Sequence, residues 1–240
     1  HVSFAYPEAG ENVLTDISFK AKKGQTIAVI GSTGSGKSTL INMIPRYYDV
    51  TKGSVKVDGV DVRDMTQKEL RDKLGYVPQK GVLFSGTIDS NIRYGKPEIT
   101  DAQVKEAAEV AQATEFIDTK PEKYKSPVSQ GGTNVSGGQK QRLSIARAIA
   151  KDPEIFIFDD SFSALDFKTD SQLRKALKEY TKDATTVIVA QRISTILGAD
   201  QIIVLDDGHM AGIGTHKELM ANCEVYQQIA RSQLSEEELA

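Results

Sequence analysis

The sequence predicts an α/β fold in which helices cover both faces of a largely parallel sheet. Short, nearly continuous runs of β-branched and aromatic residues predict strands that are buried on both faces. These runs occupy residues 26–30, 155–158, 186–190 and 201–205. Stretches with a helical pattern of apolar residues alternate with them, at residues 37–46, 101–112, 136–150, 168–180 and 225–239. Strand, glycine-rich turn and helix in repeated order are typical of layered α/β proteins.

Two regions depart from this alternation. Residues 13–21 and 54–58 are punctuated by glycines and predict antiparallel hairpins. From about residue 87 to residue 150 the helical pattern dominates, which predicts an inserted α-helical subdomain. We therefore expect a single domain over residues 1–240. Its core with an N-terminal antiparallel β subdomain would cover about 1–86 and 151–240, and its helical subdomain about 87–150. The acidic residues 235–238 are expected to end a solvated helix.

Composition excludes several classes of protein. Of the 240 residues, 39% are hydrophobic and 26% are charged, which suits one sizeable globular core. The formal net charge of −3 gives no overall basic field that would attract nucleic acid. No apolar run approaches the ~20 residues that span a bilayer, and no signal-peptide pattern opens the chain. A soluble, cytosolic chain is expected. Its abrupt start inside a predicted strand, at residues 1–6, predicts that it is a fragment of something longer.

The strongest single signal is a glycine-rich loop directly after a predicted strand. Residues 31–38 read GSTGSGKS and match the P-loop pattern G-x-x-x-x-G-K-S/T, which predicts a P-loop NTPase with a RecA-like core. Glycines let the backbone wrap around phosphates, and successive N–H groups bind an anion at a helix start. Lys37 is expected to reach the β- and γ-phosphates, and Ser38 to ligate Mg²⁺. The candidate phosphate ligands are Ser32, Thr33, Gly34, Ser35, Gly36, Lys37, Ser38 and Thr39.

A second candidate Mg²⁺ ligand, a carboxylate, follows another predicted strand. The apolar run at residues 156–158 ends in Asp159. Its carboxylate is therefore expected at the C-terminal edge of the sheet, where the P-loop also lies. There Asp159 would hold Mg²⁺, through a water molecule.

Residues 134–142, which read NVSGGQKQR, narrow the class further. Here the chain resembles the nucleotide-binding domains of ABC transporters, whose family motif is LSGGQ, and the likeness extends along nearly all 240 residues. The resemblance implies that Tyr6 stacks on the adenine of ATP. It also implies that Gln79 is the Q-loop glutamine, which takes part in catalysis and in binding Mg²⁺. It also implies that two such domains pack head to tail around ATP. Each would then offer its motif, here Ser136, Gly137, Gly138 and Gln139, to the γ-phosphate held by the other.

Residues 81–92, which read GVLFSGTIDSNI, resemble the exporter branch of that family. The resemblance implies that this segment faces the transmembrane domains of an exporter. The expected location is therefore the cytoplasmic face of the cell membrane.

Two residues depart from the family pattern at catalytic positions. Asp160 stands where the family usually has Glu, and Gln191 stands where it usually has His. Removing one methylene withdraws the carboxylate, and misplacement of roughly 1 Å can cost about 10²-fold in rate. A group that orients or deprotonates the attacking water typically contributes about 10²–10⁴-fold. Gln191 can donate a neutral hydrogen bond but carries no charge. The sequence therefore predicts that ATP and Mg²⁺ bind but that hydrolysis is weak.

Both departures belong to the site built on this chain's own P-loop, while residues 136–139 are intact. This asymmetry resembles the degenerate subunit of a heterodimeric ABC exporter, whose partner is a different and catalytically competent subunit. Residues 129–132, SQGG, also differ from the Gly-Glu-x-Gly of homodimeric exporters. The alternatives are a homodimeric exporter that tolerates Asp160 and Gln191, and a variant altered to trap ATP.

Other ABC-type functions remain as alternatives. The importer ATPases are close rivals, but residues 84–88 favour an exporter. The chromosome-associated ATPases insert long coiled coils before the LSGGQ-like motif, and no sustained heptads occur here. No stripe of Lys and Arg with interleaved aromatics predicts a nucleic-acid partner. A regulatory ATP sensor without a transport role is the alternative from a different class.

Overall fold

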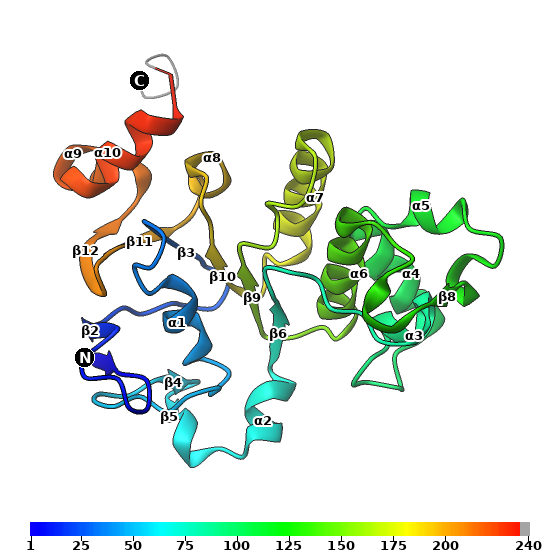
Figure 1. Ribbon diagram of the computed structural model, residues 1–240, viewed down its shortest axis with the longest axis horizontal. Helices are drawn as coiled ribbons and strands as arrows, with labels where there is room; N and C mark the ends of the chain where they lie inside the picture. The colour runs from blue at the N-terminus through cyan, green and yellow to red at the C-terminus, as the bar shows by residue number, and fades with distance from the viewer. Residues whose placement is uncertain (236–240) are drawn as a thin grey trace. The chain divides into compact units, whose positions relative to one another are not determined.

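The computed structural model describes residues 1–235, and the chain forms two compact units (Figure 1). The first unit contains residues 1–74 and the chain from residue 185 onward. The second unit contains residues 75–184 and is coloured mostly green and yellow in Figure 1. Among residues 1–235, no helix combines the length and the apolar composition needed to cross a membrane.

The first unit is built on strands in the order β12-β11-β3-β10. Their bounds are β3 Thr26–Gly31, β10 Thr185–Val189, β11 Gln201–Asp206 and β12 His209–Gly214. β3 pairs in parallel with both β10 and β11, whereas β12 pairs with β11 antiparallel. The parallel strands predicted at residues 26–30, 186–190 and 201–205 are confirmed to within one residue. β3 is continuously apolar because both of its faces are covered: Ile27, Ala28 and Val29 have no exposed surface.

The antiparallel pairs in the N-terminal part follow the predicted hairpins. β1 (Val2–Phe4) pairs with β2 (Leu14–Ile17), and β4 (Lys56–Val57) pairs with β5 (Val60–Asp61). The second turn consists of Asp58 and Gly59, both with positive φ, of 52° and 79°. An Asp-Gly pair in this conformation matches the twist of the flanking strands, so it specifies a two-residue hairpin.

The helices of the first unit are α1 Lys37–Asn42, α2 Gln67–Asp72, α8 Ile193–Ile196, α9 His216–Asn222 and α10 Glu224–Gln233, with a short 3₁₀ turn at Val62–Asp64. Of these, α1 and α10 fall in predicted stretches, at residues 37–46 and 225–239, and α2, α8 and α9 do not. α1 stops before the expected residue 46 because Pro45 has no N–H and disfavours helical geometry at the residue before it. α10 ends at Gln233, and the part of the predicted helix at residues 236–239, like most of the acidic tail, lies outside the described residues.

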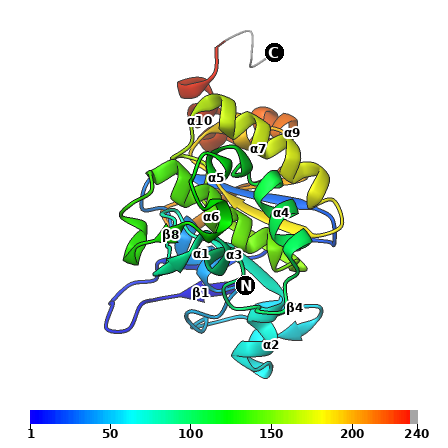
Figure 2. The same ribbon diagram turned by 90° about the vertical axis from the view of Figure 1, so that its right-hand side faces the viewer.

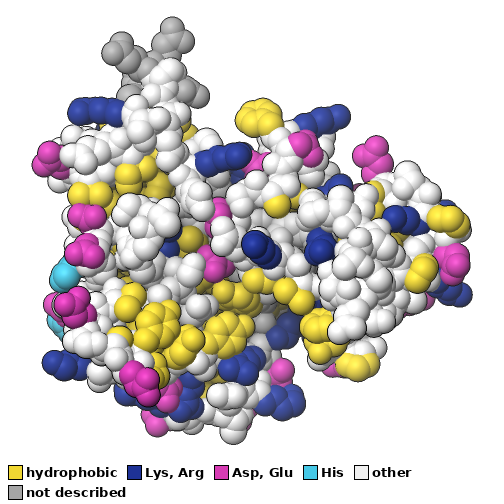
Figure 3. All heavy atoms as spheres, viewed as in Figure 1, with side chains coloured by type: hydrophobic (Ala, Val, Ile, Leu, Met, Phe, Trp, Pro, Cys, Tyr) yellow, Lys and Arg dark blue, Asp and Glu magenta, His cyan; other side chains and the backbone are white. Residues whose placement is uncertain are grey.

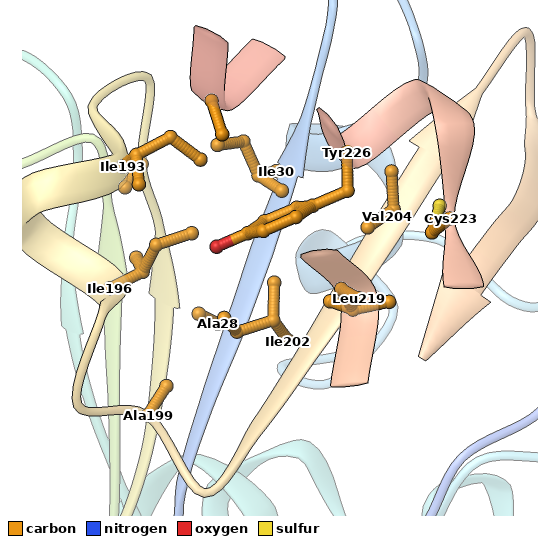
Figure 4. Close-up of a cluster of buried hydrophobic side chains, with 12 residues drawn as sticks. Ala28, Ile30, Ile193, Ile196, Ala199, Ile202, Val204, Leu219, Cys223 and Tyr226 are labelled. Atoms are coloured by element: carbon orange, nitrogen blue, oxygen red, sulfur yellow. The ribbon is translucent and has the colours of Figure 1, made fainter. Parts of the chain in front are cut away.

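Tyr226 lies at the centre of a buried cluster in the first unit (Figure 4). Its ring extends from α10 and lies among apolar side chains of β3, β11, α8 and α9. Those neighbours include Ala28, Ile30, Ile193, Ile196, Ile202, Val204 and Leu219. The Tyr226 hydroxyl lies 2.8 Å from Nδ1 of His216, and burial raises the pKa of Tyr226 to about 12. This cluster attaches α8, α9 and α10 to the sheet.

The second unit is mainly helical. β6 (Leu74–Val77) and β9 (Ile155–Asp159) are neighbours, and the run predicted at residues 155–158 is confirmed as a strand. Its helices are α3 Ile88–Ile92, α4 Asp101–Val110, α5 Thr114–Asp118, α6 Gly137–Ala150 and α7 Phe167–Tyr180, with 3₁₀ turns at Lys123–Lys125 and Gln130–Gly132. α6 packs against α3 and α4, as Figure 2 shows. Strands β7 (Gly86–Thr87) and β8 (Pro127–Val128) pair antiparallel in a stretch where no strand was predicted, because two residues are too few to show a period.

Several helices begin at a residue whose side chain caps them. In each case the hydroxyl of a Ser or Thr accepts a hydrogen bond from the backbone N–H three residues later. The side chain of that later residue accepts a hydrogen bond from the backbone N–H of the Ser or Thr. The pairs are Thr66 with Glu69, Thr87 with Ser90, Thr100 with Gln103, Ser136 with Gln139, and Thr215 with Glu218. These local signals explain why the predicted starts at residues 101 and 136 agree with the structure to within one residue.

The Tyr226 cluster yields a test of what holds the C-terminal helices in place. We expect Tyr226→Ala to lower the free energy of unfolding by about 3–5 kcal/mol, because it removes a fully buried aromatic ring. Tyr226→Phe keeps the ring and loses only the bond to His216, so a loss of about 1 kcal/mol is expected. Urea unfolding followed by circular dichroism measures both. Equal losses would mean that the hydroxyl, and not ring burial, supplies the stability.

Candidate functional site

The P-loop leaves β3 and leads into α1. Gly34 and Gly36 adopt left-handed backbone conformations, with φ of 83° and 99°. Side-chain-bearing residues rarely adopt these conformations, and a Cβ at Gly31 would collide with the carbonyl oxygen of Leu205. The glycines are therefore required by the shape of the loop and by its close approach to β11.

The charge of the P-loop comes from Lys37. Its Nζ donates to the carbonyl oxygens of Gly31 at 2.8 Å and Ser32 at 2.7 Å, which folds the ammonium group back onto the loop. Ser38 is exposed, whereas Ser35 is buried and its backbone N–H donates to Ser32 within the loop. A curved backbone with a positive charge on it and an exposed hydroxyl beside it fits a chain of phosphates with a bound divalent cation.

Tyr6 and Thr39 are brought together in the first unit. The Tyr6 hydroxyl lies 2.9 Å from Oγ1 of Thr39, which is itself buried at the start of α1. The Tyr6 ring makes edge-on contacts with Phe4, at 4.9 Å between centroids, and with Tyr48, at 5.2 Å. The residue expected to stack on adenine is thus hydrogen bonded to the residue expected at the α-phosphate. Sequence reasoning did not foresee this bond.

Gln191 is placed at the same sheet edge as the P-loop. β10 and β3 run in parallel with Val189 opposite Val29, so both strands end at the same level. The next residue, Ala190, still donates its N–H to Val29, and the exposed Gln191 follows it. The C-terminal ends of parallel strands are where α/β proteins bind their ligands.

Three predicted residues lie in the second unit, and two of them are in contact. Nε2 of Gln79 donates to Oδ2 of Asp160 at 3.1 Å. Asp160 is only 8% exposed, and its carbonyl oxygen accepts from Oγ of Ser163. Next to it, Asp159 ends β9 and lies 3.5 Å from the Tyr76 hydroxyl, measured to Oδ2. Gln79 and Asp160 are therefore bonded to each other, while Asp159, the neighbour of Asp160 along the chain, lies beside Tyr76.

Asp160 has an uncommon backbone conformation. Its φ is 46°, in the left-handed region that few residues other than glycine adopt. Asp tolerates this region because its short polar side chain can form local hydrogen bonds. The backbone at this position therefore sets the direction in which the side chain leaves the main chain, and the bond from Gln79 holds its carboxylate.

The LSGGQ-like residues form the start of α6. Oγ of Ser136 accepts from the N–H of Gln139, and Oε1 of Gln139 accepts from the N–H of Ser136, each at 3.2 Å. Both side chains thus cap the helix, and the Ser136 O–H can still donate to a further group. Gly137 and Gly138 leave the backbone of the first turn uncovered, and the first turn contains no acidic residue. This end of α6 can therefore receive an anion.

An aromatic surface occurs at residues 82–94 of the second unit. The rings of Phe84 and Tyr94 stack with centroids 4.2 Å apart, although the two residues are 40% and 56% exposed. The guanidinium of Arg147, from α6, lies 5.2 Å and 5.5 Å from these two ring centroids. We call these three residues the aromatic platform. Tyr94 and Arg147 lie outside the exporter-like segment at residues 81–92, and the aromatic Tyr94 two residues after it was the only signal that the sequence offered.

Arg147 attaches the platform to the segment around it through hydrogen bonds to backbone and amide oxygens. It donates to the carbonyl oxygens of Val82 and Asn91, each at 2.8 Å, and to Oδ1 of Asn91 at 3.0 Å. Burial lowers the pKa of Arg147 to about 10, so the group remains cationic at neutral pH. A planar guanidinium suits this position because it can stack and donate several bonds at once.

The fold and the P-loop define a P-loop NTPase, and comparison with known proteins identifies the family. The ABC transporter family matches residues 14–163, and the chain belongs to that family as an ATP-binding domain. It is 49% identical, over 96% of its length, to an uncharacterized ABC transporter ATP-binding protein of Mycobacterium tuberculosis, of which it covers 40%. It is 46% identical, over 95% of its length, to a putative multidrug export ATP-binding/permease protein of Staphylococcus aureus, again covering 40% of that relative.

A solved structure agrees with this assignment. The structure of a bacterial Atm1-family ABC exporter with ATP bound superimposes with a TM-score of 0.93 at 38% sequence identity. The match covers 98% of this chain and 41% of the exporter chain. The present chain thus spans about two fifths of the length of the proteins it matches.

The aromatic platform yields a test of Arg147. Arg147→Lys keeps a positive charge but loses the planar fork, so we expect the free energy of unfolding to fall by about 2 kcal/mol and cleavage within residues 82–94 by a protease to rise. Urea unfolding and limited proteolysis measure these effects. The matched control is Arg174→Lys. Arg174 is bonded to Asp170 one turn away on its own helix, and because lysine can keep this i,i+4 ion pair, a loss below about 0.5 kcal/mol is expected. Similar losses in the two variants would contradict the role assigned to Arg147.

Proposed function

We propose that this chain is the ATP-binding domain of an ABC exporter and that its own site retains ATP better than it hydrolyses it. The observation that carries this proposal is the hydrogen bond between Gln79 and Asp160. At the position where the family usually has the water-polarising Glu, this chain has a shorter carboxylate that already accepts a bond from Gln79. Such a carboxylate has both less reach and less acceptor capacity for an attacking water.

The proposed nucleotide contacts begin at the P-loop. Lys37 would bind the β- and γ-phosphates, Thr39 the α-phosphate, and Tyr6 the adenine. The backbone and side chains of Ser32, Thr33, Gly34, Ser35, Gly36 and Ser38 would complete the phosphate contacts. Mg²⁺ prefers oxygen ligands and keeps several water molecules when it is bound to phosphates. Ser38 and Gln79 would therefore supply oxygen ligands, and Asp159 would hold the ion through a water molecule. Bound Mg²⁺ would neutralise charge on the phosphates.

Weak hydrolysis would follow from two residues, Asp160 with its shorter side chain and Gln191 with its neutral one. Asp160 lacks one methylene relative to Glu, and its left-handed backbone sets the direction in which the side chain leaves the main chain. Gln191, at the end of β10, can donate a hydrogen bond to the γ-phosphate but supplies no positive charge. Neither change affects the charge of Lys37 or Asp159, so binding of Mg·ATP is expected to persist.

The proposed partners are a second ABC domain and the transmembrane domains of the exporter. The intact α6 start, Ser136 to Gln139, would serve the γ-phosphate bound by a different, catalytically competent subunit. The aromatic platform offers exposed apolar surface beside the exporter-like segment, as a contact for a membrane domain would require. The Staphylococcus aureus relative combines ATP-binding and permease functions in its name, and the Atm1-family relative is an exporter. The proposed location of the domain is therefore the cytoplasmic face of a membrane.

Nucleic acid is not among the proposed partners. On the face shown in Figure 3, the described Lys and Arg side chains are interspersed with Asp and Glu and form no continuous basic stripe. A nucleic-acid interface requires such a stripe to neutralise phosphates. A purely regulatory ATP-binding role differs from the proposal in one observable: the regulatory protein would not co-purify with membrane domains.

Single-turnover hydrolysis of Mg·ATP tests the degenerate site. We expect the wild type to bind ATP with negligible turnover, and Asp160→Glu combined with Gln191→His to raise the hydrolysis rate by about 10²-fold or more, because reach and charge are both restored. The measurement is made with the domain alone and with a candidate partner domain. Lys37→Ala is the control, which should abolish ATP binding in both backgrounds. Brisk hydrolysis by the wild type alone would instead identify an ordinary catalytic subunit, of a homodimeric exporter or an importer.

Tyr6 yields a second test, of the adenine contact. Tyr6→Ala is expected to weaken ATP binding by about 1–3 kcal/mol through loss of stacking. Tyr6→Phe retains the ring and loses only the bond to Thr39, so it should weaken binding by about 1 kcal/mol or less. Isothermal titration with ATP and with inorganic triphosphate separates the effects, since triphosphate has no base. Equal weakening of both ligands by Tyr6→Ala would count against a contact between Tyr6 and the base.

A further inference from the structure

A glutamine on the C-terminal helix binds the backbone on both sides of Arg192. Oε1 of Gln233 accepts from the N–H of Ile193 at 2.8 Å, and Nε2 of Gln233 donates to the carbonyl oxygen of Gln191 at 2.8 Å. One carboxamide therefore forms two short hydrogen bonds to residues that lie two apart in the loop after β10. The two bonds use the acceptor and a donor of the amide together, as a neighbouring β-strand would.

The bond to Ile193 fills a gap at the start of α8. The first N–H groups of a helix have no partner within the helix and are usually satisfied by the side chain of the N-cap residue. Arg192 is the N-cap of α8 and makes no side-chain cap hydrogen bond. Gln233 supplies the missing acceptor from another helix. The geometry of the loop that carries Gln191 thus depends on α10.

α10 is in turn held firmly against the same core as α8. Tyr226 and Ala230 of α10 are fully buried, and they lie in one cluster with Ile193 and Ile196 of α8 (Figure 4). Gln233 is one turn beyond Ala230, near the end of α10. The apolar cluster sets the distance between the two helices, and the carboxamide then fixes the peptide planes of the loop.

We propose that Gln233 is a positioning residue for Gln191: it acts through the backbone of residues 191–193 to present the Gln191 side chain to bound nucleotide. The inference rests on the proposed function, because it uses Gln191 as the γ-phosphate contact. The coupling works in both directions, since binding energies that link two sites are reciprocal. Occupation of the nucleotide site therefore strengthens the attachment of the end of α10 to this loop.

The test combines a structural and a functional readout on the intact protein. Gln233→Ala removes both hydrogen bonds, so we expect hydrogen–deuterium exchange of a peptide covering residues 191–196 to speed up by about fivefold, the effect of losing one typical hydrogen bond. Dissociation of Mg·ATP, followed by displacement of a fluorescent ATP analogue, is expected to speed up by a similar factor of about five. Gln233→Glu keeps the acceptor for Ile193 but sets a carboxylate against the Gln191 carbonyl oxygen. It should therefore protect residue 193 while still releasing ATP faster.

Gln228→Ala is the matched control on the same helix. Among the residues that the structure describes, the exposed side chain of Gln228 is hydrogen bonded to Glu224 of the same helix, at 3.5 Å. The substitution therefore changes helix propensity as Gln233→Ala does and leaves the loop untouched. Neither exchange at residues 191–196 nor ATP release should change in this variant. The same changes in Gln228→Ala as in Gln233→Ala would overturn the proposal.

The remaining outcomes separate the inference from the proposed function. Unchanged exchange in Gln233→Ala would show that the two bonds do not hold the loop, and it would overturn the inference alone. Faster exchange with unchanged ATP release would show that the loop does not position Gln191 for nucleotide, again overturning the inference alone. A wild-type protein that fails to retain Mg·ATP would contradict the proposed function, and the inference with it.

Discussion

The parallel pairing of β3 with β10 and β11 is the constraint on which the first unit depends. It places the P-loop and Gln191 at one edge because Val29 and Val189 stand opposite each other. The same register brings Leu205 beside Gly31, so the first residue of the P-loop has room for no side chain. The apolar runs that make these strands recognisable also fix where their polar ends emerge. Ligand-binding geometry and core packing are in this sense set by the same contacts.

The elements that could be predicted are those whose signal is local. The continuous apolar runs of β3, β9, β10 and β11 identify buried strands, and Ser or Thr caps mark where α4 and α6 begin. The end of α1 was missed because the apolar period continues past Pro45, although the proline itself stops the helix. β7 and β8 were missed because a strand of two residues has no period to detect.

The candidate site divides in the same way. Lys37, Ser38, Asp159 and the start of α6 could be found from motif spacing, because the chemistry needs those residue types close together in sequence. Contacts between distant parts of the chain leave no such pattern. Residues 191 and 233 are 42 apart, and residues 91 and 147 are 56 apart, so neither the carboxamide of Gln233 nor the guanidinium of Arg147 could be assigned a role beforehand. The Gln79–Asp160 hydrogen bond is an intermediate case. Both residues were predicted as site residues, but the bond from the Gln79 amide to the Asp160 carboxylate was not.

Arg147 also determines how the aromatic platform responds to salt concentration. In the part of the chain that the structure describes, its guanidinium is bonded to carbonyl and amide oxygens and lies against two aromatic rings, with no carboxylate paired to it. Mobile ions weaken attraction between opposite exposed charges but have little effect on buried dipoles and π faces. We therefore expect the platform to keep its shape from dilute buffer to concentrated salt. The proposed apolar contact with a membrane domain would then persist under conditions that dissociate interfaces built from ion pairs.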